Sequence, residues 1–286
     1  MMTAFEERLI RVFPRRTKAT PDDGLAFTAE PDFFPPEDAS AVHVSCTFTW
    51  DLPRAEELAR KWSVLGLPVQ IGGPATGQQS RGFTPGLYLK RGYVITSRGC
   101  PNRCWFCSVP TREGVGVREL PIVDGWNVLD DNLLACSETH VRAVFAMLGQ
   151  QKHRAEFTGG LEAARLQPWH VELLATLKPR PKQIFFAYDT ANDYEPLIKA
   201  GLMLLEAGFT SASHTLRCYV LCGYAGDTCE KAESRMRQAV SAGFMPMAMV
   251  WSRDGSKSRD WTTFQRKWAR PAFIAASSRS VEGLFA

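Results

Sequence analysis

The sequence contains no run of about 18 apolar residues that could cross a membrane, and its N-terminal segment lacks the apolar stretch of a secretion signal. We therefore expect a cytoplasmic protein without a membrane partner. The excess of basic residues is small, with 34 Lys and Arg against 30 Asp and Glu, so the net charge of +4 does not predict a polyanionic partner. The hydrophobic share of 45% excludes a disordered, collagen-like or coiled-coil chain.

Histidine is scarce, with 5 scattered residues, and no second pair of cysteines or histidines follows the one tight group of cysteines at a suitable distance. That group is Cys100, Cys104 and Cys107, out of 8 cysteines in all. In a long chain without a secretion signal, reduced thiols are a better interpretation than disulfides. Three thiolates suit a [4Fe-4S] cluster whose fourth iron has no protein ligand, whereas a structural zinc site needs a fourth protein ligand. Zinc and simple burial remain the alternatives at this point.

Strands and helices alternate over most of the chain after residue 90. The predicted strands cover 92–97, 126–129, 155–158, 183–187, 216–222 and 246–251, and the predicted helices cover 138–148, 169–177, 194–207 and 228–242. This alternation is typical of parallel β-α units, which form an open or closed α/β barrel or a doubly wound sheet. In each of these folds the functional site lies at the carboxyl ends of the strands. Before it we predict a strand near 9–13 and a β-α-β unit with a strand at 41–49, a helix at 52–65 and a strand at 69–73.

The cysteine segment reads Cys100-Pro-Asn-Arg-Cys104-Trp-Phe-Cys107. This C-x3-C-x2-C pattern, with an aromatic residue before the last cysteine, resembles the signature of the radical S-adenosylmethionine (radical SAM) superfamily. The resemblance covers roughly residues 92–252. It implies a partial (βα)6 TIM-like barrel and a [4Fe-4S] cluster whose open iron binds SAM. It further implies that one electron, from an external donor of the flavodoxin or ferredoxin type, cleaves SAM to a 5′-deoxyadenosyl radical. That radical abstracts hydrogen from a substrate that the sequence does not identify.

The resemblance also implies residues that bind SAM, at the ends of strands or beside the cysteines: Phe106, Asp130, Asn132, Thr158 (with Glu162 nearby), Asp189 and Gly223. Asp130 and Asn132 stand where the family binds the SAM ammonium group, although its usual glycines are absent there. Asp189 stands where a polar residue binds the ribose hydroxyls, and we expect Asp130 and Asp189 at the ends of neighbouring strands. Helix capping is the alternative role for these polar residues. The cysteines outside the cluster are interpreted as buried, with Cys222 as a candidate for catalysis.

Residues 1–90 form a predicted small α/β segment. The stretch from Ser45 to Trp50, the helix after it and the stretch from Ile71 to Thr76 resemble the second half of the cobalamin-binding domain in cobalamin-dependent radical SAM enzymes. The Asp-x-His-x-x-Gly loop that would supply a lower cobalamin ligand is missing, and only about 40 proline-rich residues precede the strand. We therefore expect a reduced domain without cobalamin, followed by the barrel core at 91–252.

Residues 253–286 form a predicted C-terminal tail in which Trp261, Phe264 and Trp268 lie among seven basic residues and three acidic ones. Basic and aromatic side chains together can bind a nucleic-acid strand through phosphate contacts and base stacking. The alternative is an amphipathic helix at 262–269 that packs its aromatic side chains on the barrel. Two other classes of function also remain open: a non-catalytic iron–sulfur protein for electron transfer or binding, and a zinc-binding nucleic-acid module.

Overall fold

The computed structural model describes residues 8–32, 36, 38–80 and 82–275. The chain folds into two compact units, Met1–Gly125 and Trp126–Ala286, and both are mixed α/β structures built on parallel sheets. The segment predicted as one barrel core, 91–252, is thereby divided. Its first part, with the three clustered cysteines, belongs to the first unit.

The first unit contains a four-stranded sheet in the order β2-β1-β3-β4, with every pair parallel. Its elements are β1 (Leu9–Val12), β2 (Ala26–Phe27), β3 (Ala41–Ser45), α1 (Leu52–Trp62) and β4 (Val69–Gly72). The predicted crossover from strand through helix to parallel strand is therefore confirmed. The strand predicted at 41–49 ends early, at Ser45, because a short helical turn at Thr49–Asp51 already leads into α1.

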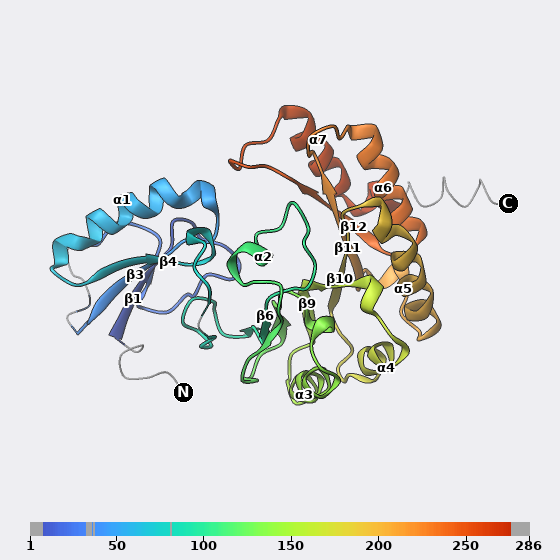
Figure 1. The fold of residues 1–286 in the computed structure, drawn as a ribbon, viewed down its shortest axis with the longest axis horizontal. Coiled ribbons are helices and arrows are strands. Elements are labelled where there is room, and N and C mark those ends of the chain that lie inside the picture. The colour runs from blue at the N-terminus through green and yellow to red at the C-terminus, as the bar shows by residue number, and fades with distance from the viewer. Residues whose placement is uncertain (1–7, 33–35, 37, 81, 276–286) are drawn as a thin grey trace. The chain divides into compact units, whose positions relative to one another are not determined.

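Helix α1 packs on this sheet through one face. Ala55, Leu58 and Trp62 are fully buried and recur at intervals of three and four residues, which places them on one side of the helix. They join the buried residues of β1 and β3 in one hydrophobic core. The Trp62 ring also has a polar partner, because its Nε1 donates to the carbonyl oxygen of Ala29 over 3.0 Å. Figure 1 shows α1 lying across the sheet.

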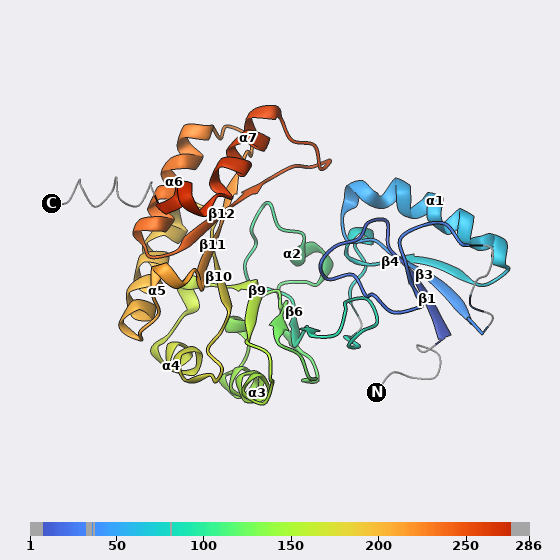
Figure 2. The same ribbon diagram turned by 180° about the vertical axis from the view of Figure 1, so that it is seen from behind.

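The second unit is built on a larger parallel sheet, whose own strands lie in the order β12-β11-β10-β9-β8. These strands are β8 (Asn127–Val128), β9 (Glu156–Leu161), β10 (Gln183–Tyr188), β11 (Leu216–Cys222) and β12 (Met245–Val250). The helices are α3 (Glu138–Gly149), α4 (Pro168–Thr176), α5 (Tyr194–Glu206), α6 (Cys229–Ser241) and α7 (Arg259–Trp268). Figures 1 and 2 show α3 to α6 along the same, outer side of the curved sheet. Within the described residues the sheet does not close into a barrel.

Two strands differ from their predicted bounds. The strand predicted at 155–158 continues to Leu161, which pairs with Phe186 after a shift in register. The strand predicted at 92–97 is divided into β5 (Tyr93–Val94) and β6 (Ser97–Arg98). Strand β6 pairs antiparallel with β7 (Arg118–Glu119).

Helix α7 packs on the edge strand β12 as an amphipathic helix. Phe264 and Trp268 are 5% and 1% exposed, and Gln265 Nε2 donates to the carbonyl oxygen of Ala248 over 2.8 Å. These aromatic rings are therefore used in packing, as in the second interpretation of the tail. Arg279 and Glu282 of that tail lie outside the described residues. Within the described part of the chain, no helix is both long and apolar enough to cross a membrane.

Candidate functional site

The three clustered cysteines lie in a loop whose two ends are fastened together. Strands β6 and β7 pair on either side of it, and Leu120 N donates to the carbonyl oxygen of Thr96 over 2.8 Å. Gly99, directly before the first cysteine, has a φ of +90°, and a β-carbon there would lie 2.2 Å from the carbonyl oxygen of Gly116. A side chain at residue 99 is therefore excluded by both conformation and space.

Within this loop the cysteines are reduced and only half-buried. Cys104 and Cys107 line an open hollow of about 540 Å³ together with Arg103 and Trp105. Trp105 is 61% exposed, and its ring meets Phe106 edge-on at 5.4 Å between centroids. A hollow of this size is within the range of small-molecule sites, so the loop presents thiols where a ligand can reach them.

A buried carboxylate that the sequence analysis missed supports the far end of the loop. The side chain of Glu113 is fully buried and receives hydrogen bonds from Ser80 Oγ at 2.6 Å, Arg118 Nη2 at 2.6 Å and Arg112 Nε at 3.0 Å. Burial by itself would raise the pKa of Glu113, but the hydrogen bonds from Ser80 and Arg112 lower it below its usual value. The only sequence signal was an acidic residue between two arginines, a pattern common on protein surfaces.

A second group of possible metal ligands lies in the second unit. Among the described residues, one group of three or more metal-ligating side chains has its ligand atoms all within 4.8 Å of one another, and it consists of Asp130, Cys136 and His140. A lone zinc ion draws its ligands to one point, whereas in a cubane each thiolate binds a different iron.

In the second unit, the predicted SAM-binding carboxylates lie at one edge of the sheet. Asp130 follows β8 and Asp189 follows β10, so both lie at the carboxyl ends of parallel strands. The expectation that these strands are neighbours is wrong, because β9 lies between them. Asp130 is 2% exposed, and the backbone of Gly159 on β9 packs against its peptide.

Asp189 is a half-buried carboxyl group with a shifted pKa. Burial, reinforced by the nearby charge of Asp193, raises the pKa of Asp189 to about 7. The capping role at this turn falls to Asp193, whose Oδ2 accepts from the backbone N–H of Asp189 at 3.0 Å and of Thr190 at 2.7 Å. The carboxyl group of Asp189 is thus not a helix cap.

The other predicted residues of this edge form two pairs. Asn132 Nδ2 donates to Glu162 Oε2 over 2.6 Å, and Arg165 Nε donates to the same oxygen over 2.7 Å. Thr158 Oγ1 donates to Asn127 Oδ1, which ties β9 to β8. Asn132 and Glu162, two candidates from different loops, are thereby brought together. Helix α3 is capped by Ser137 and not by Asn132.

The turn after β11 is held by a buried ion pair. Asp227 Oδ2 accepts from Gly223 N at 2.8 Å and from Arg235 Nη2 at 2.7 Å, and the Asp227 side chain is fully buried. Gly223 has a φ of +75°, and a β-carbon there would lie 3.3 Å from the Trp261 ring. Cys222 is fully buried, which raises the pKa of its thiol to about 12. A buried thiol with a raised pKa favours the packing role, and catalysis by Cys222 stays a prediction.

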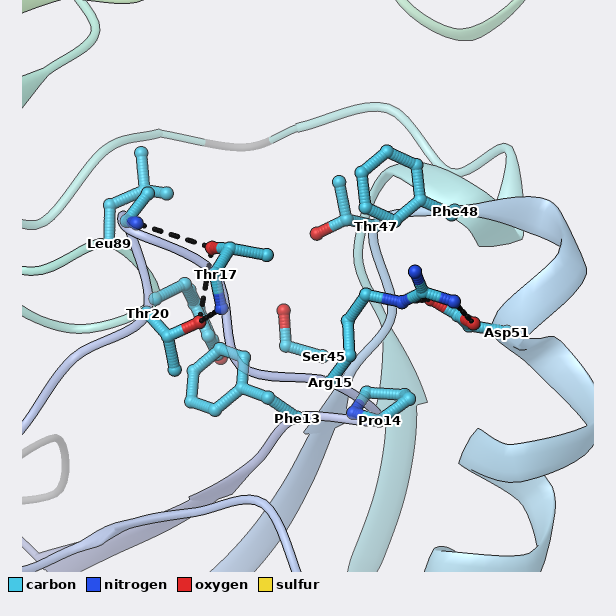
Figure 3. A pocket seen from close by; sticks show the side chains of 12 residues that line it. Phe13, Pro14, Arg15, Thr17, Thr20, Ser45, Thr47, Phe48, Asp51 and Leu89 are labelled. Carbon is cyan, nitrogen blue, oxygen red and sulfur yellow. Dashed lines mark hydrogen bonds and ion pairs between the residues drawn. The ribbon is translucent and has the colours of Figure 1, made fainter. Parts of the chain in front are cut away.

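A second, much smaller cavity lies in the first unit, at the carboxyl ends of β1 and β3 (Figure 3). Its volume is about 30 Å³, enough for a water-sized occupant. Arg15 reaches across it and donates two hydrogen bonds to Asp51, at 2.6 and 2.5 Å, while its guanidinium lies 5.6 Å from the centre of the Phe48 ring. The absence of cobalamin from this unit stays a prediction.

No known protein-family profile matches the chain, and no curated protein matches it.

Proposed function

We propose that the protein is a radical SAM enzyme in which Cys100, Cys104 and Cys107 hold a [4Fe-4S] cluster. The observation that carries the proposal is the cysteine loop itself. Its thiols are reduced and half-buried, and two of them line an open hollow. When bound, the cluster would supply the electron that splits SAM into methionine and a 5′-deoxyadenosyl radical.

The chain's own residues have separate tasks in this proposal. The loop cysteines would hold the cluster through their three thiolates, with SAM as the further ligand. Trp105, which lines the hollow and meets Phe106 edge-on, would pack beside the cluster. In the second unit, Asp189 would accept hydrogen bonds from the ribose hydroxyls, and the Asn132–Glu162 pair would bind the SAM ammonium group. The placement of α3 to α6 on one side of the sheet supports the partial barrel that the resemblance implies.

The test is anaerobic reconstitution with iron and sulfide, followed by dithionite and SAM. We expect about four irons per chain and release of 5′-deoxyadenosine, with both lost when Cys100, Cys104 and Cys107 are replaced by Ala. Cys229→Ser is the matched control, because Cys229 is also reduced and half-buried but lies on α6.

Other outcomes would support the rival functions. A cluster that forms without yielding 5′-deoxyadenosine indicates a non-catalytic iron–sulfur protein. Zinc in place of iron at the loop cysteines, after purification without oxygen, indicates a zinc-binding module. Either result overturns the proposal. Exchange of dithionite for a reduced flavodoxin or ferredoxin then tests the expected electron donor.

A further inference from the structure

We propose a zinc site, separate from the cysteine loop, formed by Asp130, Cys136 and His140 in the second unit. The carboxylate, thiol and imidazole ligand atoms of these residues all lie within 4.8 Å of one another. The three residues come from one connection, between the end of β8 and the first turn of α3. The proposal does not depend on the cluster, because it uses none of the residues of the cysteine loop.

The chemistry of the three groups selects the metal. Thiolate and imidazole are ligands of zinc, and a carboxylate oxygen completes a common set, whereas magnesium and calcium take oxygen ligands alone. Around a tetrahedral zinc with bonds of about 2.0–2.3 Å, the ligand atoms stand roughly 3.3–3.8 Å apart. The observed separations need to close by only about an ångström, which side-chain rotation can supply. The fourth position would hold water.

The backbone around the three residues is already fixed. Leu133 and Leu134, which are 1% and 6% exposed, anchor the short helical turn at Leu133–Ala135. Ser137 then caps α3, and its Oγ accepts from the backbone N–H of His140 over 3.2 Å. Cys136 and His140 therefore stand one turn apart on either side of a defined helix start.

Asp130 is positioned from the other side, by β9. A β-carbon on Gly159 would lie 2.6 Å from the carbonyl oxygen of Asp130 and 3.0 Å from its nitrogen, so the two backbones are in contact. This contact holds the carboxylate at the end of β8. Gly159→Ala should push Asp130 away from Cys136 and His140. Gly160→Ala is the control. Its φ of +91° makes the substitution strained, but no atom lies within 4 Å of a β-carbon there, so Asp130 should stay in place.

The test uses the full chain with Cys100, Cys104 and Cys107 replaced by Ala, so that no loop thiol binds metal. We expect one zinc per chain, and Co²⁺ in its place should show a thiolate-to-cobalt charge-transfer band. Replacing a residue that only contacts a metal ligand weakens metal binding by up to roughly 100-fold. Cys136→Ser and His140→Gln remove a ligand itself, so each should weaken Zn²⁺ binding by more than that. The controls Cys229→Ser and His153→Gln should bind as tightly as the parent. At a Zn²⁺ concentration 100 times the Kd, the unfolding equilibrium constant of the parent should fall about 100-fold.

Zinc content near zero in the parent, with a native circular dichroism spectrum, overturns the proposal, as does full zinc content in Cys136→Ser. Asp130→Asn separates this role from SAM binding in the chain with its loop cysteines intact. Loss of zinc with unchanged SAM affinity supports the metal site. Retained zinc with weakened SAM binding overturns the metal site and favours the other role of Asp130, binding the SAM ammonium group.

Discussion

Gly99 lies so close to Gly116 that a β-carbon on the first would stand 2.2 Å from the carbonyl oxygen of the second. The contact joins the start of the cysteine loop to its end, one residue before Cys100. No side chain fits there, and the φ of +90° at Gly99 independently favours glycine. The geometry of the thiols thus rests on a backbone contact outside the C-x3-C-x2-C pattern.

Gly99→Ala should therefore open the loop. Because the new methyl group displaces the bend that contains Gly116, we expect the iron content after reconstitution to fall several-fold, measured by a colorimetric iron assay. Gly114→Ala is the matched control, since Gly114 has a similar φ of +87° but open space around its β-carbon position. It should lose about 1–2 kcal/mol of stability from backbone strain and keep its iron. Equal iron loss in both variants would contradict the role of the contact.

Glu113 should be required for a stable loop. Glu113→Ala leaves Arg112 and Arg118 without their shared buried carboxylate, and breaking such a pair costs roughly 3–5 kcal/mol. The control is Glu119→Gln on the exposed part of β7. Since the pKa of Glu113 is lowered, its contribution is present above the unfolded value of about 4.3 and is lost as the pH falls through the folded value. The stability difference between wild type and Glu113→Gln, from denaturant unfolding, should shrink from pH 7 to pH 3.

Asp189→Asn should weaken SAM binding if Asp189 holds the ribose hydroxyls. Charge-assisted hydrogen bonds contribute roughly 1.5–3 kcal/mol, so the Kd should rise about 10- to 150-fold, as measured by calorimetry on reconstituted protein. Iron content should stay at the wild-type level, because Asp189 is not an iron ligand. An unchanged Kd would remove Asp189 from the SAM site.

The same residue should leave a signature in the pH dependence of folding. The pKa of Asp189 is raised to about 7, so its contribution is fully present below the unfolded value of about 3.9 and is lost as the pH rises through 7. Asp189→Asn should therefore gain stability relative to wild type between pH 4 and pH 8, by roughly 1–3 kcal/mol given the partial exposure of the side chain. Asp131→Asn serves as the control. A difference that does not change with pH would contradict the raised pKa.

Trp268 should behave as a core residue. Trp268→Ala removes a side chain that is 1% exposed and should cost about 3–5 kcal/mol in thermal or denaturant unfolding. Trp268→Phe keeps the ring and removes an indole N–H that has no hydrogen-bond partner among the described residues. It should cost much less than Trp268→Ala. A small loss of stability in both variants would contradict the core role and favour an exposed ring that can stack on a nucleic-acid base.

Residues with a strong local pattern were predictable from the sequence. The strand at Leu216–Cys222 and the helices after it follow from hydrophobic period and capping residues, and the cysteine loop follows from its spacing. The predicted strand at 155–158 ends before Gly159 and Gly160, because glycine weakens the strand pattern, whereas the observed strand continues to Leu161. In the structure Gly159 lies against the backbone of Asp130, and no local pattern reports this contact between separate segments.

The missed site residues depend on contacts between distant segments. Glu113 receives hydrogen bonds from Ser80, 33 residues earlier, so its burial could not be seen in the sequence around it. Cys136 and His140 are four residues apart, a spacing that does not by itself predict a metal site. The structure adds Asp130 as a third ligand beside them. A scattered histidine and a cysteine outside the clustered group carry no such signal by themselves.

The pairing of β6 with β7 bears on whether the cysteine loop needs a metal in order to fold. The two ends of the cysteine loop are joined by strand hydrogen bonds, by the contact of Gly99 with Gly116 and by Glu113, none of which involves iron. The loop is therefore preorganised, and little conformational entropy remains to be lost when a cofactor arrives. Zinc fingers, in contrast, fold only around their metal. The cysteine loop should therefore be folded in the chain without metal.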